Sequence, residues 1–129
     1  MNILDIRVQL ETTLADVLGT YRLANGATTP AIAVRAAGES LPPGTTVEGL
    51  EVVIVRDPEP VTVVQYQQQS VGARWTLYLV DWSGGLPLQT IAGRLIWAYP
   101  GSNATLINVP KGVGPGAQMR VDLQTNPAT

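Results

Sequence analysis

The pattern of apolar residues predicts an amphipathic helix at the start of the chain. Apolar side chains recur at three- and four-residue steps from Ile3 to Leu18, which places them on one helical face. Asn2 can cap this helix, and Asp5 three residues later completes a pair that resembles a capping box at the positive end of the helix dipole. Gly19 is a natural stop, so we expect the helix to end just before it.

Beyond Gly19 the period of the pattern changes to the alternation that is typical of strands. Asn25-Gly26 is a strong turn signal, and Gly38–Thr46 and Asp57–Pro60 are polar or proline-rich breaks. Strands are predicted between these signals at 20–23, 31–37, 49–55, 61–69 and 74–82. Gly72 separates the last two of them. Because the breaks are short, we expect these strands to be antiparallel neighbours.

A second amphipathic helix is predicted from Pro87 to Tyr99, and Pro100 ends it. Its inner face would consist of Leu88, Ile91, Leu95, Ala98 and Tyr99. A short extended segment at 104–109 follows, then a loop at 110–116. The closing strand, 117–124, would direct Met119, Val121 and Leu123 inward.

This order of elements predicts an α+β fold, a mostly antiparallel sheet with two helices packed on one face. The length of 129 residues is that of one domain, which we expect to span residues 1–124, followed by a flexible tail at 125–129. The strand from Arg74 to Trp82 is apolar on both faces, and the helices can cover only one of them. The second face therefore needs other cover, part of which we expect a neighbouring subunit to provide.

The low content of charged residues supports such subunit contacts. Charged residues make up 14% of the chain, against roughly a quarter in ordinary globular proteins, while hydrophobic residues make up 45%. Interface cores are depleted in charge, although a monomer covered by uncharged polar side chains would also fit. Of Trp75, Trp82 and Trp97, we expect at least one to lie at a rim or in an interface.

The residue content excludes most catalytic chemistry. The chain has no histidine and no cysteine, which removes the common nucleophile–base pairs, the usual zinc sites and a disulfide scaffold. The carboxylates of Glu48, Glu51, Asp57 and Glu59 flank one strand and could hold a divalent ion, but they lack the spacing of a calcium loop. Solvated strand ends are the favoured interpretation. We expect no enzymatic activity and no cofactor.

Charge and hydropathy also limit the partners. The net charge is −2 and no basic run occurs, so the sequence does not favour nonspecific DNA binding through the phosphates. The loop that begins at Lys111 is rich in glycine but lacks the order of a phosphate-binding loop, and a strand follows it where a helix would be needed. The first residues do not form a signal peptide, and no apolar stretch is long enough to span a bilayer. We expect a protein made in the cytoplasm, with no membrane partner.

Several motifs together resemble those of the tail-terminator proteins of long-tailed bacteriophages. They are the first amphipathic helix, the run Pro30–Arg35, the strand Trp75–Val80 of the W-x-L-x-L-x-V type, the helix Leu88–Pro100 of the L-x-x-I-x-x-x-L-I-x-x-Y-P type, and the closing strand Gln118–Leu123. The resemblance covers most of the chain, but each motif is degenerate.

The resemblance implies a subunit that forms a ring, typically a hexamer, between the tail tube and the head–tail connector in the neck of the virion. Its partners would be further copies of itself, the tail-tube protein and the connector protein, and DNA would only pass through the channel. The ring would stop tube growth and present a docking face to the head. The candidate inter-subunit contacts are Glu39, Leu41, Asp57, Glu59, Gln67, Gln68, Trp82 and Lys111.

Three other interpretations stay open. The chain could be another virion part: a head-completion protein, a tail-tube subunit or a capsid cement protein. It could be a carbohydrate-binding module that uses Trp82 and Trp97, with Asp81 and Ser83 as polar partners. An enzyme with a carboxylate-only site is the least favoured of the three.

Overall fold

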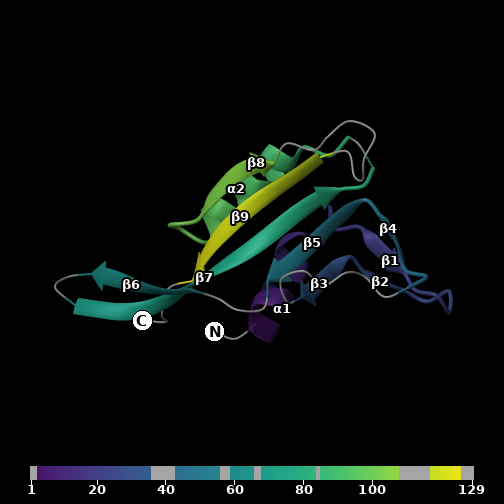
Figure 1. Ribbon diagram of the computed structural model, residues 1–129. Helices are drawn as coiled ribbons and strands as arrows, with labels where there is room; N and C mark the ends of the chain where they lie inside the picture. Colours follow the sequence, from purple (N-terminus) through teal and green to yellow (C-terminus); the bar gives the residue numbers. More distant parts are fainter. Residues whose placement is uncertain are drawn as a thin grey trace.

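The computed structural model confirms the α+β class and places two helices on one face of a mostly antiparallel sheet (Figure 1). It describes residues 3–35, 43–55, 59–65, 68–83, 85–107 and 117–125. Within these residues a small three-stranded sheet accompanies the main sheet. No helix among them is both long enough and apolar enough to cross a membrane.

The first helix, α1 (Ile3–Thr13), buries the face that the sequence predicts, with Ile6, Leu10 and Leu14 fully buried. It ends five residues earlier than predicted. The Thr12 hydroxyl donates to the Val8 carbonyl at 3.1 Å, a local bond by which threonine competes with the helix backbone. The chain then continues in turns to Leu18, which forms a parallel bridge with Leu50. The proposed cap Asn2 lies outside the described residues.

The main sheet has the strand order β3-β5-β7-β9-β8, and β6 pairs with the first part of β7. Its strands are β3 (Ile32–Arg35), β5 (Leu50–Val55), β6 (Glu59–Gln65), β7 (Gln68–Asp81), β8 (Asn103–Ile107) and β9 (Ala117–Thr125). The pairings are antiparallel except that of β3 with β5, which is parallel. The expectation of antiparallel neighbours is therefore wrong for this pair, because the chain passes through the small sheet between β3 and β5.

The small sheet has the order β2-β1-β4 and consists of β1 (Thr20–Arg22), β2 (Thr28–Pro30) and β4 (Thr46–Glu48). The predicted Asn25-Gly26 turn is confirmed, with Gly26 at a φ of 86°. The strand predicted at 31–37 is confirmed as β3 from Ile32 to Arg35, while residues 36 and 37 lie outside the described residues. The sequence did not predict β2 in the small sheet before it; Ala31 lies between the two strands, where its N–H donates to the Gly19 carbonyl and its carbonyl accepts from the Val52 N–H. β4 includes the end of the predicted loop 38–46, so this part of the prediction is also wrong.

The core lies between the helices and one face of the main sheet. Alternate residues of the three central strands face it, namely Leu50, Val52, Ile54, Trp75, Leu77, Leu79, Met119, Val121 and Leu123. The second helix, α2 (Leu88–Ala98), buries Leu88, Ile91, Ala92 and Leu95 against this face. The prediction of Ala98 on the inner face is wrong, because Ala98 is exposed at the last helical position, whereas the burial predicted for Tyr99 is confirmed.

β9 extends one residue beyond its predicted end, as far as Thr125. Thr125 is buried, and its hydroxyl accepts a hydrogen bond from Trp75 Nε1 at 3.3 Å and donates to the Ala73 carbonyl at 3.2 Å. These two bonds fix the strand end against β7. The rest of the predicted tail, 126–129, lies outside the described residues.

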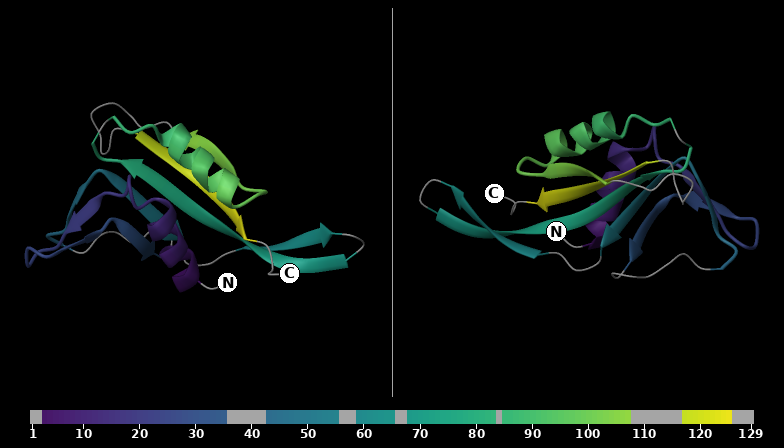
Figure 2. Two further views of the ribbon diagram at one scale, coloured as in Figure 1. Left: turned by 180° about the vertical axis from the view of Figure 1, so that it is seen from behind. Right: turned by 45° about the horizontal axis from the view of Figure 1, so that its top comes forward.

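β7 is a single 14-residue strand that serves two parts of the molecule. Its second part pairs with β5 and β9, whereas its first part pairs with β6, from Gln65↔Gln68 to Glu59↔Arg74. The predicted strand 61–69 is confirmed in β6 as far as Gln65, but its end and the predicted break at Gly72 are wrong: Gln68 and Gln69 already belong to β7, and Gly72 lies within β7 opposite Val61. We call β6 and residues 68–72 of β7 the arm. It projects from the body of the protein (Figures 1 and 2).

The two sheets meet where Gly19 passes the start of β5. A Cβ atom on Gly19 would lie only 2.0 Å from the Glu48 carbonyl oxygen and 2.7 Å from the Leu50 nitrogen, both of them backbone atoms. Gly49 takes a φ of 79°, a left-handed conformation that favours glycine, and its own Cβ would approach Gly19 Cα at 3.1 Å. Only two glycines allow these backbone segments to cross this closely.

We expect Gly19→Ala to prevent folding or to lower the free energy of unfolding severely, because the added methyl group overlaps backbone that cannot move aside. The matched control is Gly93→Ala in α2, where an added Cβ meets no atom within 4 Å. Removing a glycine from a helix interior should raise stability by about 0.5–1 kcal/mol. Denaturant unfolding followed by circular dichroism measures both. Equal stability of the two variants would contradict the tight crossing.

Candidate assembly surfaces

The outer face of the helix layer exposes apolar side chains that the core does not use. Trp97 lies two residues after the buried Leu95, which turns its side chain about 200° around the helix axis and away from the sheet. Its side chain is 89% exposed. With Gly93, Ile96 and Pro100 it lines an open depression of ≈480 Å³. Exposed apolar surface of this kind marks interaction sites in soluble proteins.

The other helix, α1, also exposes an apolar side chain, that of Val8, which is 61% exposed. A second open depression joins the two helices, lined by Val8, Gln9, Thr12, Thr13, Ala98 and Tyr99. The helices thus present neighbouring surfaces on the side of the molecule that is away from the sheet (Figure 2). We call Val8, Ile96, Trp97 and Pro100 the helix-layer face.

Two polar contacts fix α1 and its following turn to α2. Arg94 donates two hydrogen bonds to the Asp16 carboxylate at 2.6 and 2.9 Å, and these bonds lower the pKa of Asp16 and raise that of Arg94. The Tyr99 hydroxyl donates to Gln9 Oε1 at 2.6 Å, and burial raises the pKa of this phenol. The ion pair is exposed and contributes little stability by itself. Its two-pronged geometry nevertheless sets the orientation of one helix against the other.

Trp82, one of the predicted contact residues, lies on the opposite face of the main sheet from the helices. Its indole Nε1 donates to Glu51 Oε1 at 3.0 Å, and the Tyr21 hydroxyl donates to Glu51 Oε2 at 2.5 Å. Glu51 is only 3% exposed, whereas Trp82 remains 41% exposed. The carboxylate therefore joins the small sheet to the end of β7, and Trp82 has an internal partner.

Asp81 has a similar internal role in the turn after β7. It is buried, and its carboxylate accepts hydrogen bonds from the Ser83 backbone and hydroxyl at 2.9 and 2.8 Å and from the Leu86 backbone at 3.0 Å. Asp81 and Ser83 therefore bond to each other in this turn. Trp82 and Trp97 lie on different faces of the sheet, so they do not form one sugar-binding platform.

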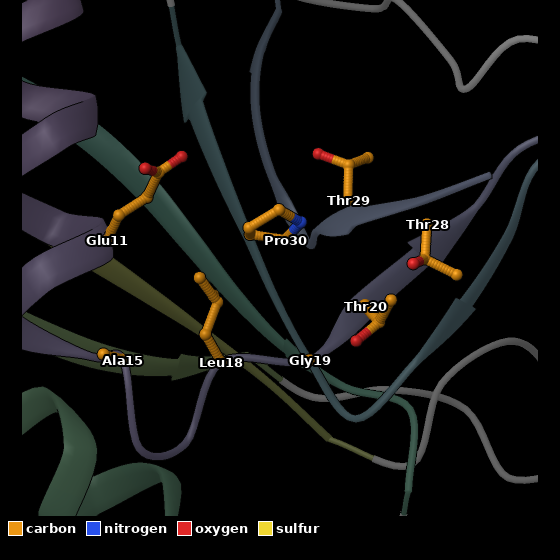
Figure 3. A pocket seen from close by; sticks show the side chains of 8 residues that line it. All are labelled: Glu11, Ala15, Leu18, Gly19, Thr20, Thr28, Thr29 and Pro30. Atoms are coloured by element: carbon orange, nitrogen blue, oxygen red, sulfur yellow. The ribbon is translucent and has the colours of Figure 1, made fainter.

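An open pocket of ≈490 Å³ lies between α1 and the small sheet (Figure 3). Its lining residues are Glu11, Ala15, Leu18, Gly19, Thr20, Thr28, Thr29 and Pro30. Glu11 is its single carboxylate, and Arg7 lies 3.4 Å from this group. Glu11 is of a residue type that can act as a general base, and its contact with Arg7 favours the charged carboxylate.

Of the four carboxylates that flank the predicted strand, the structure describes the side chains of Glu48 and Glu51, which lie in different surroundings. Glu51 is buried in its contact with Tyr21 and Trp82, while Glu48 is exposed at the end of β4. Among the described residues no group of three or more acidic, histidine or cysteine side chains could hold a metal ion. Asp57 lies outside these residues, and Glu59 is described in its backbone only.

Of the eight predicted contact residues, the structure places three. Glu59 begins β6 at the base of the arm, Gln68 begins β7 at the arm tip, and Trp82 lies at the far end of β7. The other five lie outside the described residues: Glu39, Leu41, Asp57, Gln67 and Lys111. The three placed residues are distributed along β7 and do not form one surface.

The sequence interpretation missed the helix-layer face as a surface. The sequence contained a signal for Trp97, because it follows the inner position Leu95 by two residues, a step that turns a helical side chain outward. The expectation that at least one tryptophan would be at a rim is consistent with the exposure of Trp97, while its place in an interface stays a prediction. No family model, curated protein or solved structure matches this chain.

The Glu51 contact generates a test of the link between the two sheets. Tyr21→Phe removes a hydrogen-bond donor from a buried carboxylate, so the free energy of unfolding should fall by about 1.5–3 kcal/mol. Tyr78→Phe is the matched control, since Tyr78 is half-buried on β7 and its hydroxyl has no hydrogen-bond partner among the described residues; it should change stability by less than about 0.5 kcal/mol. Urea unfolding compares them, and similar losses in both variants would contradict the role of Glu51.

Proposed function

We propose that this chain is a structural virion protein similar to phage tail terminators. It forms a ring, expected to have six copies, at the top of the tail tube. The ring ends tube growth and joins the tail to the head connector. This proposal rests on the sequence resemblance described above and on the surfaces of the fold.

The observation that carries the proposal is the helix-layer face. Trp97 is almost fully exposed and Val8 is mainly exposed, although the core is complete without either of them. A tryptophan offers 150–250 Å² of surface, and interfaces are enriched in this residue. An assembly subunit needs an exposed apolar face of this kind.

The physical mechanism is competition for a surface. The end of a growing tube presents the surface to which the next tube subunit adds. A ring that occupies this surface stops growth, and its opposite side offers a different surface to the connector. A rigid α+β body with apolar surface on its helices and an arm at one end provides contacts in more than one direction. The net charge of −2 would let DNA pass without being held.

We expect the purified protein to form one discrete closed oligomer, which native mass spectrometry would identify as six copies. Added to its cognate tail tubes during assembly, it should stop their elongation, as electron micrographs of tube length would show. A strict monomer throughout the micromolar range, with no ring even on the tubes, would contradict the proposal. Trimers on capsids would favour a cement protein instead.

Trp97→Lys provides a variant for the same measurements. Because the side chain is exposed, the free energy of unfolding should change by less than about 0.5 kcal/mol. A central interface tryptophan contributes 2 kcal/mol or more, so binding to tubes or between copies should weaken by about 30-fold or more. The matched control is Thr90→Lys, an exposed position in the first part of α2. If both variants bind like the unchanged protein, the helix-layer face is not an assembly surface.

A further inference from the structure

The arm is a two-stranded hairpin that has no third strand among the described residues. β6 pairs with β7 from Gln65↔Gln68 to Glu59↔Arg74, and β9 reaches only as far as Ala73. The arm therefore continues beyond the main sheet with two strands (Figure 2). An isolated two-stranded hairpin is at best marginally stable in water, so a third strand would add substantially to its stability.

The sequence of the arm lacks the features that normally protect a strand edge. Charged side chains and prolines at edges prevent pairing with other chains. From Val61 to Ala73 the chain contains no charged residue and no proline, and valines give β6 a strong preference for the extended state. Glu59 and Pro60 lie only at the base of the arm.

One edge of the main sheet has the same unprotected character. β8 is the last strand in the order and pairs only with β9 among the described strands. Its sequence Asn-Ala-Thr-Leu-Ile has no charge and no proline, and Leu106 is 56% exposed. The edge strands β2, β3 and β4 are shorter, with 3, 4 and 3 residues, and each ends in a proline or a charged residue: Pro30, Arg35 and Glu48.

The geometry points to the neighbouring copy as the source of the missing strand: we propose that the arm of one copy adds to the β8 edge of the next. Within one chain this pairing is impossible, because the arm continues β7 lengthwise while β8 lies two strands to its side. Backbone hydrogen bonds along the added strand would supply affinity, as in other cases of strand addition. The sheet would then run from one subunit into the next.

This contact is heterologous, because two different surfaces of the chain meet. Heterologous contacts form a closed ring when the rotation between copies permits, and otherwise form an open filament. The inference deepens the proposed function by naming the contact that would close the ring, and of that proposal it requires only self-association. Tail-tube binding is a separate matter.

Engineered disulfides test the pairing directly, because the chain contains no cysteine of its own. The variant carries Val63→Cys in β6 with Thr105→Cys in β8. A disulfide requires Cα atoms within about 4.4–6.8 Å, so only paired strands should become linked. A second version with Val64→Cys in place of Val63→Cys covers the other face of the arm, since successive side chains alternate.

On mild oxidation, gels without reductant should show a ladder of linked subunits that ends at the size of the closed oligomer. The control double variant, Val63→Cys with Thr28→Cys in β2, should give at least tenfold less linked product. Val63→Cys alone should give almost none. The inference would be overturned if neither the Val63→Cys nor the Val64→Cys version, each with Thr105→Cys, gave more linked product than the control. It would also be overturned if Val63→Cys alone gave mainly arm-to-arm dimers.

A second, independent measurement uses Leu106→Lys, which adds a protecting charge at an exposed position of β8. We expect a normal circular dichroism spectrum and at least tenfold weaker self-association in sedimentation experiments, whereas Thr28→Lys on exposed β2 should leave self-association unchanged. Unchanged self-association of Leu106→Lys would overturn the arm contact, and so would an unmodified protein that stays monomeric.

If rings form and link through the arm but do not cap tubes, the proposed function fails while this inference holds. If rings cap tubes without linkage, only this inference fails.

Discussion

The structure depends on one strand, β7, whose 14 residues exceed what the body of the protein can pair. Its second part lies at the centre of the main sheet, where Trp75, Leu77 and Leu79 face the helices and complete the core. Its first part continues outward, and β6 pairs with it to form the arm. The pairing of β7 with β9 begins only at Ala73, so the backbone of the arm pairs with no strand of the main sheet other than β7 among the described residues. The same strand therefore holds the fold together and carries the projecting arm.

The far end of β7 is fixed in a different way. There the small sheet joins the main sheet through the crossing of Gly19 and Gly49, and Glu51 accepts hydrogen bonds from Tyr21 and Trp82. Buried carboxylates are costly unless they are well bonded, so this cluster orients the two sheets only because its partners are in place. The result is a body fixed at one end with a projecting arm at the other. Such a division suits a subunit whose partners lie in several directions.

Local patterns in the sequence predict the helices and the inner face of the sheet well. The three- and four-residue periodicity places Ile6, Leu10 and Leu95 in the core, and alternation places Val121 there. The change from the small sheet to the main sheet at Ala31, between β2 and β3, was not predictable, because it depends on bonds to Gly19 and Val52, which are distant in the sequence. The parallel pairing of β3 with β5 was not predictable either, because it arises from the passage of the chain through β4 of the small sheet between these two strands.

The surfaces were harder to predict than the core. Gly72 gives a local turn signal that the pairing with β6 overrides, so the last strand of the hairpin was predicted to begin only at Arg74, whereas β7 begins at Gln68. Tryptophan is a residue type enriched in interfaces, yet the indole of Trp82 donates a hydrogen bond to Glu51 on another strand of the same chain. Exposure of Trp97 follows from its helical position, but the preference of tryptophan for the core concealed this. For Gly72 and Trp82, a contact with a residue on another strand decides where the residue lies, and local sequence does not reveal that contact.

The central claim is that the arm is completed by another copy of the chain. Amide hydrogen exchange, measured across the concentration at which the protein associates, tests it most directly, because newly paired strand amides become protected. The account predicts that residues 61–72 of the arm and 103–107 of β8 gain protection together on association, while the β2 amides at Thr28 and Thr29 do not change. Exchange in the arm that stays the same at all concentrations, or protection gained only on the helix-layer face, would contradict it.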